Sequence, residues 1–227
     1  MQNTRLVHIL LTAALILVCA NSACADDRNL LPKYGSLPKA AWQKEADANF
    51  IAAIDEEYQG DRIKASSDLA LRGWQYLAGR DLASAMRRFN QAWLLNNHNG
   101  IALWGMGAVE ASLGKVDESL QLFAEAEKFV GDEINFSVDY AKAVGIAGVD
   151  RKDDALLKDA FDRFERIYQK APQNTRNLQN WAMTLFGVGK YSEAWEKVRL
   201  AEATPGKGDL DPRFLKALQS RMPRPHD

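Results

Sequence analysis

A set of small and aromatic residues recurs in this chain at a spacing of 34 residues. The first copy consists of Gly73, Tyr76, Ala85, Phe89 and Ala92, and the second of Gly107, Glu110, Ser119, Phe123 and Ala126. Only Tyr76, which is replaced by Glu110, changes type. Later in the chain, Ala160, Phe164 and Ile167 are followed at the same spacing by Ala194, Val198 and Ala201. A fixed period of this length is typical of stacked helix–turn–helix units, so the sequence predicts an all-α fold.

The pattern predicts four helix pairs between residues 66 and 205. We expect helices at 67–78 and 81–95, 101–113 and 116–129, 135–147 and 155–170, and 176–188 and 192–203. The third pair departs from the period, because Ala160 follows Ser119 by 41 residues instead of 34. We assign the seven additional residues to an exposed loop from Gly148 to Asp154, where acidic residues flank Arg151 and Lys152.

Small residues are expected where the two helices of a pair cross closely. The first helices supply Gly73, Gly107, Ala141 and Ala182, and the second helices supply Ala85, Ser119, Ala160 and Ala194. Phe89, Phe123 and Phe164 are predicted to fill the space between neighbouring pairs. A single pair cannot bury this face alone, so the pairs are expected to stack.

Both ends of the array are predicted to carry a capping helix. At residues 39–60, apolar residues about four apart predict an amphipathic helix: Trp42, Ala46, Phe50 or Ala53, and Ile54. Residues 26–38, with two prolines and a glycine, are predicted to be an extended or disordered linker. Within 206–227, Asp211-Pro212 predicts the start of a C-terminal capping helix followed by a tail.

Residues 1–25 have the features of a cleaved export signal. Arg5 precedes an apolar run from Leu6 to Val18, which is shorter than the roughly 20 residues of a membrane span. Ala23-Cys24-Ala25 resembles a small-residue cleavage site, and cleavage there would leave a mature chain without cysteine. An alternative is a lipoprotein signal with lipidation at Cys24, although the preceding residues lack the usual leucine. The expected location is the periplasm, or a lipid anchor in the envelope.

The charge balance excludes a strong electrostatic attraction to nucleic acid. Lys and Arg number 29 and Asp and Glu number 30, so the net charge is −1. Neither nucleic acid nor an anionic membrane surface is favoured by such a chain. Membrane association is expected only through lipidation.

The repeated residues resemble the tetratricopeptide repeat, over about residues 66–205. The clearest unit runs from Trp181-Ala182 through Gly189-Lys190-Tyr191-Ser192-Glu193-Ala194 to Pro205. The resemblance implies a superhelical array of about four repeats whose first helices line a concave groove. It also implies that the protein binds a protein or peptide partner.

By this resemblance, the groove is lined by apolar and aromatic residues. The expected partner-binding residues are Trp74, Leu77, Trp104, Ala108, Ala111, Lys142, Arg176, Met183 and Phe186. Of the positions that hold a terminal carboxylate in some relatives, only that of Lys142 is cationic and none is Asn, which argues against such a clamp. Tryptophans at helical spacing are also common in protein cores, and end helices folded over the groove would fill it; both alternatives remain open.

We therefore predict a non-enzymatic adaptor or scaffold of the bacterial envelope, without cofactor or metal, present as a monomer or weak homo-oligomer. His98 lies in a polar turn, and His226 lies next to the C-terminus. The chain has no zinc-protease, nucleophile-elbow or phosphate-loop motif. The alternatives are a self-associating structural scaffold and an enzyme subunit with an unrecognised site.

Overall fold

The computed structural model describes residues 28–204 and 210–225. All regular secondary structure in these residues is helical, and the helices pack in adjacent pairs, which confirms the predicted all-α class. The chain divides into two compact units, which meet in sequence between Val109 and Glu110.

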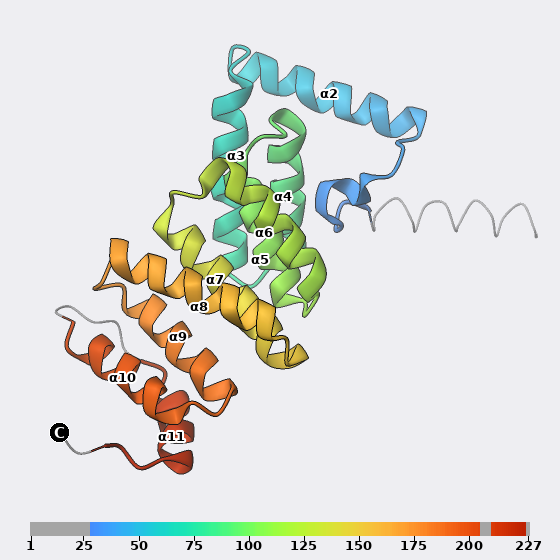
Figure 1. The fold of residues 1–227 in the computed structure, drawn as a ribbon. Coiled ribbons are helices and arrows are strands. Elements are labelled where there is room, and N and C mark those ends of the chain that lie inside the picture. The colour runs from blue at the N-terminus through green and yellow to red at the C-terminus, as the bar shows by residue number, and fades with distance from the viewer. Residues whose placement is uncertain (1–27, 205–209, 226–227) are drawn as a thin grey trace, which may run out of the picture. The chain divides into compact units, whose positions relative to one another are not determined.

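The first unit consists of a short 3-10 helix followed by longer α-helices with short connections between them. In chain order these are the 3-10 helix η1 (Pro32–Ser36), α2 (Ala41–Glu57), α3 (Arg62–Ala78), α4 (Leu82–Leu95) and the first part of α5 (Gly100–Ser112). Helices α3 and α4 lie side by side as an antiparallel pair (Figure 1). Asp61 is the N-cap residue of α3, and its carboxylate accepts a hydrogen bond from the backbone N–H of Lys64 at 2.9 Å.

The ring of Phe89 is the centre of the first unit. It is completely buried and lies directly against Gly73 of α3 and Gly105 of α5. A Cβ atom at Gly73 would lie 2.5 Å from the ring, and one at Gly105 would lie 2.2 Å from it. The predicted combination of a small residue and a space-filling phenylalanine is therefore confirmed here.

The segment predicted as a linker is instead attached to helix α4, as far as the structure describes it. Asn90 is fully buried, and its Nδ2 donates to the carbonyl oxygens of Asn29 at 3.0 Å and Leu31 at 2.9 Å. Burial raises the pKa of Tyr34 in the same segment. The linker prediction is wrong because a buried amide on α4 needs acceptors, and this segment supplies them.

Helix α2 is formed as predicted, but its apolar face is only slightly buried. Ile54 is the one buried residue of this helix, whereas Trp42 remains 57% exposed. Ala46 and Ala53 are also exposed. In Figure 1, α2 extends away from the α3–α4 pair, so it covers little of the first unit.

The second unit contains the end of α5 and six further helices. These are α6 (Val116–Val130), α7 (Ile134–Arg151), α8 (Asp154–Lys170), α9 (Thr175–Gly187), α10 (Tyr191–Glu202) and α11 (Pro212–Arg221). The pairs α7–α8 and α9–α10 pack closely, and α7 also packs against α6 and α9. The predicted small residues Ala141, Ala160, Ala182 and Ala194 are completely buried.

Four short turns join the expected pairs, and each contains one residue in the left-handed region. These residues are Arg80, Gly114, Lys152 and Gly189, with φ between 53° and 78°. Each is followed directly by the N-cap residue of the next helix. The connection between α2 and α3 has the same feature, since Gly60 with φ 83° directly precedes the N-cap residue Asp61, so this turn geometry is not restricted to the predicted pairs.

The predicted loop from Gly148 to Asp154 is wrong, because most of it is helical. Helix α5 ends five residues after Gly107, whereas α7 ends ten residues after Ala141. Relative to Ala160, helix α8 also begins earlier than α6 begins relative to Ser119. Only Lys152 and Asp153 separate α7 from α8. The insertion therefore lengthens both helices at the tip of the pair, where added residues do not change the phase of the apolar faces.

Glu110 is a buried carboxylate at the start of the second unit. Its side chain has no exposed surface, and Oε2 forms an ion pair with Lys115 Nζ at 3.1 Å. It stands at the position where the first repeat has Tyr76. The change of residue type therefore buries a carboxyl group whose ion-pair partner is Lys115, although neither carboxyl oxygen has a hydrogen-bond partner among the described residues.

Within the region predicted to form a C-terminal capping helix, the structure has α11 at Pro212–Arg221. Asp211 caps α11 by accepting from the Arg213 N–H at 2.9 Å. Phe214 and Leu218 are buried on the side of α11 that packs against the unit. Residues 206–209 and 226–227 of the predicted cap and tail lie outside the described residues, as does the predicted signal at 1–25.

Candidate functional site

None of the nine predicted partner-binding residues is fully buried. Ala111, Lys142, Arg176 and Met183 are exposed, and the other five are half-buried. Trp74, Leu77, Trp104 and Ala108 belong to the first unit, and the remaining five belong to the second. The structure therefore presents two separate sets of candidate residues.

In the first unit, the two tryptophans form a pair. Their ring centroids lie 4.6 Å apart with an angle of 62° between the planes, and Trp74 also packs edge-on against Phe89 at 5.8 Å. The Trp74 Nε1–H is buried and has no hydrogen-bond partner among the described residues. The tryptophans therefore pack against each other, and Trp74 packs against the core, while both residues are half-buried.

In the second unit, two of the predicted residues meet in one pocket. Lys142 of α7 and Met183 of α9 line a cavity of about 150 Å³ between these helices. The other lining residues are Gly145, Ile146, Val149, Asp150, Asn180 and Thr184. Most of the lining is apolar, and Ile146 and Met183 remain 45% and 40% exposed at the rim.

The base of this pocket is set by a close approach of α7 to α9. A Cβ atom at Gly145 would lie 2.6 Å from Thr184 Oγ1, so only glycine fits there without movement. Thr184 Oγ1 donates to the carbonyl oxygen of Asn180 at 3.0 Å, within α9. The buried hydroxyl of Thr184 therefore has a hydrogen-bond partner within its own helix.

The pocket has the size of one side chain. A cavity of about 150 Å³ accommodates a group as large as benzene. Sites for complete small-molecule ligands are larger, roughly 300–1,000 Å³. The dimensions fit one large apolar side chain of a partner better than a metabolite.

Two other predicted residues are used within the protein. Arg176 forms an ion pair with Asp139 of α7. Phe186 packs edge-on against Phe214 of α11, with centroids 5.9 Å apart. Gln179 Oε1 also accepts from the Asp211 N–H at 2.7 Å. The C-terminal helix thus covers part of the surface of α9 that the resemblance assigns to the groove.

A second, polar cleft of about 440 Å³ lies among α6, α7 and α8. Arg163 at its centre pairs with Glu127 at 2.7 Å and Asp159 at 3.0 Å. The guanidinium also lies 3.9 Å from the centroid of Tyr140, whose pKa is raised by burial. The charge of Arg163 is thus compensated within the protein, whereas Arg166 and Lys170, which also line the cleft, form no ion pair among the described residues.

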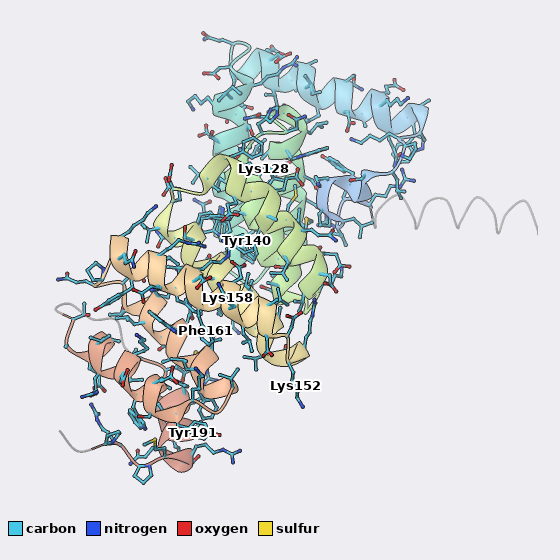
Figure 2. All side chains as sticks on the ribbon, in the orientation of Figure 1. Lys128, Tyr140, Lys152, Lys158, Phe161 and Tyr191 are labelled. Atoms are coloured by element: carbon cyan, nitrogen blue, oxygen red, sulfur yellow. The ribbon has the colours of Figure 1, made fainter. Side chains whose placement is uncertain are left out.

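Figure 2 shows how differently the labelled side chains of this unit are placed. Tyr140 lies in the interior among the helices, whereas Lys152 projects outward from the tip of the α7–α8 pair. Lys152 is exposed and does not line the pocket. A substitution of Lys152 is therefore a suitable control for substitutions of pocket residues.

Groups of three His, Cys, Asp or Glu residues arranged to hold a metal are absent from residues 28–204 and 210–225. His98 is exposed, and its backbone N–H donates to Asn96 Oδ1 at 3.1 Å. No helix in the described part of the chain is long and apolar enough to cross a membrane.

No protein-family model matches the chain, and comparison with curated proteins finds no similar sequence.

Sequence reasoning did not identify several residues of the α7–α9 pocket, namely Gly145, Ile146, Val149, Asp150, Asn180 and Thr184. Val149 and Asp150 were assigned to a loop. The available signal was the 41-residue spacing, since seven additional residues at the tip of a helix pair fit longer helices as well as a longer loop.

Proposed function

We propose that this chain is a non-enzymatic adaptor that binds a protein or peptide segment. The observation that carries the proposal is the pocket between α7 and α9, which brings together the predicted residues Lys142 and Met183. An exposed apolar depression bordered by charged side chains, here Lys142 and Asp150, is a common form of peptide-recognition surface. The resemblance to tetratricopeptide repeats supports the same function.

The test is selection of random peptides on the purified chain, with a substitution in the pocket and a matched control. Met183→Asp and Ile146→Asp are expected to weaken binding of selected peptides at least about tenfold, because they place a charge where an apolar side chain would sit. Leu200→Asp is the control, since Leu200 on α10 is 38% exposed and lies outside the pocket. Peptides that bind the wild type and Met183→Asp equally would contradict the proposal.

A self-associating scaffold is the second candidate, favoured by one observation. Trp42 on α2 is 57% exposed, and this 17-residue helix buries only Ile54. Such a surface is stabilised when another protein covers it. Light scattering over a range of concentrations, with Trp42→Ser as the comparison, distinguishes a self-associating chain from a monomeric adaptor.

We further propose that the chain is exported, on the basis of residues 1–25. Mass spectrometry of the protein from fractionated cells tests this. A mature N-terminus at Asp26 supports soluble export, and a lipidated Cys24 supports the envelope-anchored alternative. A cytoplasmic chain that retains residues 1–25 contradicts both.

A further inference from the structure

The seven-residue insertion in the third repeat builds one end of the α7–α9 pocket. If α7 ended where α5 does relative to its small residue, it would stop at Ile146. The additional turn supplies Val149 and Asp150, both of which line the pocket. A Cβ atom at Gly187 of α9 would lie 2.8 Å from Val149, so this turn is held firmly against α9.

This extra turn gives the pocket opposite charges at its two ends. Lys142, Ile146 and Asp150 follow one another at four-residue intervals, so they share one ridge of α7. Eight residues of helix separate the charged pair by about 12 Å along the axis. Ile146 stands between them, beside Met183 of α9.

Both charges are available for a ligand. Lys142 and Asp150 are exposed, and within the part of the chain that the structure describes neither forms an ion pair. The contrast with Arg163 is clear, because that guanidinium is shared by two carboxylates of the protein itself. An ammonium and a carboxylate at this distance favour a ligand with the complementary charges in matching positions.

We infer that the pocket recognises an extended segment of a partner protein in which a large apolar residue is flanked, two residues away on either side, by an acid and a base. In an extended chain, residues two apart point to the same side and four residues span about 13 Å. The apolar side chain then enters the cavity, while the acid meets Lys142 and the base meets Asp150. A single cavity suits one anchor of an extended segment, whereas helical ligands use several anchors along a groove.

This inference rests on the proposed function, and it makes Lys142 and Asp150 the determinants of specificity. The probe is a fluorescent peptide containing Asp-Ser-Leu-Ser-Lys, acetylated and amidated so that it has no terminal charge. Lys142→Glu and Asp150→Lys are each expected to weaken its binding about three- to tenfold, since each replaces an attraction by a repulsion. Lys152→Glu and Glu196→Lys are the controls, because both residues are exposed and lie outside the pocket.

Exchange of the peptide charges gives the decisive result. Binding to Lys142→Glu is expected to recover with Lys-Ser-Leu-Ser-Lys, and binding to Asp150→Lys with Asp-Ser-Leu-Ser-Asp. The charge recognition would be overturned if the three peptides bound equally to the wild type and to all charge variants and lost binding only to Met183→Asp. That result would leave the adaptor function intact. The charge recognition would also be overturned if none of the three peptides bound. The random-peptide selection tests the adaptor function separately.

Discussion

The side-chain amide of Asn99 donates a hydrogen bond of 2.8 Å to the hydroxyl of Ser66, which joins residues 33 positions apart. The Ser66 hydroxyl in turn donates to the carbonyl oxygen of Ala92 at 2.7 Å. Both side chains are buried. One hydroxyl therefore links the start of α3, the end of α4 and the residue that precedes α5.

Ser66→Ala is expected to destabilise the protein by about 1–3 kcal/mol, because it leaves the Asn99 amide and the Ala92 carbonyl without this buried partner. Urea unfolding measures the effect. Ser67→Ala is the matched control, since Ser67 is exposed and bonds only to Ile63 of its own helix. An equal loss of unfolding free energy in the two variants would show that the hydrogen bonds among Ser66, Ala92 and Asn99 add no stability beyond that of the exposed Ser67 hydroxyl.

Asn90→Ala is expected to release the N-terminal segment from α4. The substitution removes the donor to the Asn29 and Leu31 carbonyls, so amides in residues 28–38 should exchange with solvent faster. Hydrogen exchange by mass spectrometry provides the measurement. Arg87→Ala, at an exposed position of the same helix, should leave the exchange unchanged. Unaltered protection in Asn90→Ala would mean that other contacts hold the segment.

Gly148→Ala is expected to separate α7 from the start of α8. A Cβ atom there would lie 2.9 Å from the backbone nitrogen of Leu157, which cannot move independently of its helix. We expect a loss of about 1–3 kcal/mol in the free energy of unfolding. Gly79→Ala provides the comparison, because its Cβ would lie 3.4 Å from the nearest atom. A Gly148→Ala variant as stable as the wild type would contradict this helix contact.

Asp81 should contribute to stability in a pH-dependent manner. The Ser84 N–H donates to its carboxylate at 3.0 Å, and this hydrogen bond lowers the pKa of Asp81. A lowered pKa in the folded state means that the contribution is present above the unfolded pKa, near 3.9, and is lost as the pH falls through the folded value. Asp81→Ala should therefore lower Tm at pH 7, and the difference from the wild type should shrink below pH 4.

Asp81→Asn distinguishes the N-cap hydrogen bond from the negative charge of the Asp81 carboxylate. Asparagine still accepts a hydrogen bond at an N-cap, but it does not titrate in this range. Its Tm should stay above that of Asp81→Ala both at pH 7 and in acid. A constant difference between wild type and Asp81→Ala at every pH would show that protonation of this carboxylate does not affect folding.

The amino-acid sequence by itself determined the helical class and small residues that are buried between the helices. It did so because residues such as Gly73 and Phe89 have a direct local consequence: only a glycine leaves room for the ring. It also predicted Lys142 and Met183 as partner-binding residues, and in the structure both line one pocket. Periodicity reports which face of a helix is buried, and that information survives without knowledge of the neighbours.

The tertiary structure decided what the periodicity leaves open. Residues added at the tip of a helix pair leave the phase of the pattern unchanged, so the spacing alone did not distinguish a longer pair from the loop predicted at Gly148–Asp154. Likewise, only the packing of α7 against α9 shows that Asp150 shares a pocket with Lys142, and only the fold shows that Asn90 holds Asn29 and Leu31. These contacts join residues far apart in the chain, and they depend on the positions of whole helices, which no local pattern of side chains specifies.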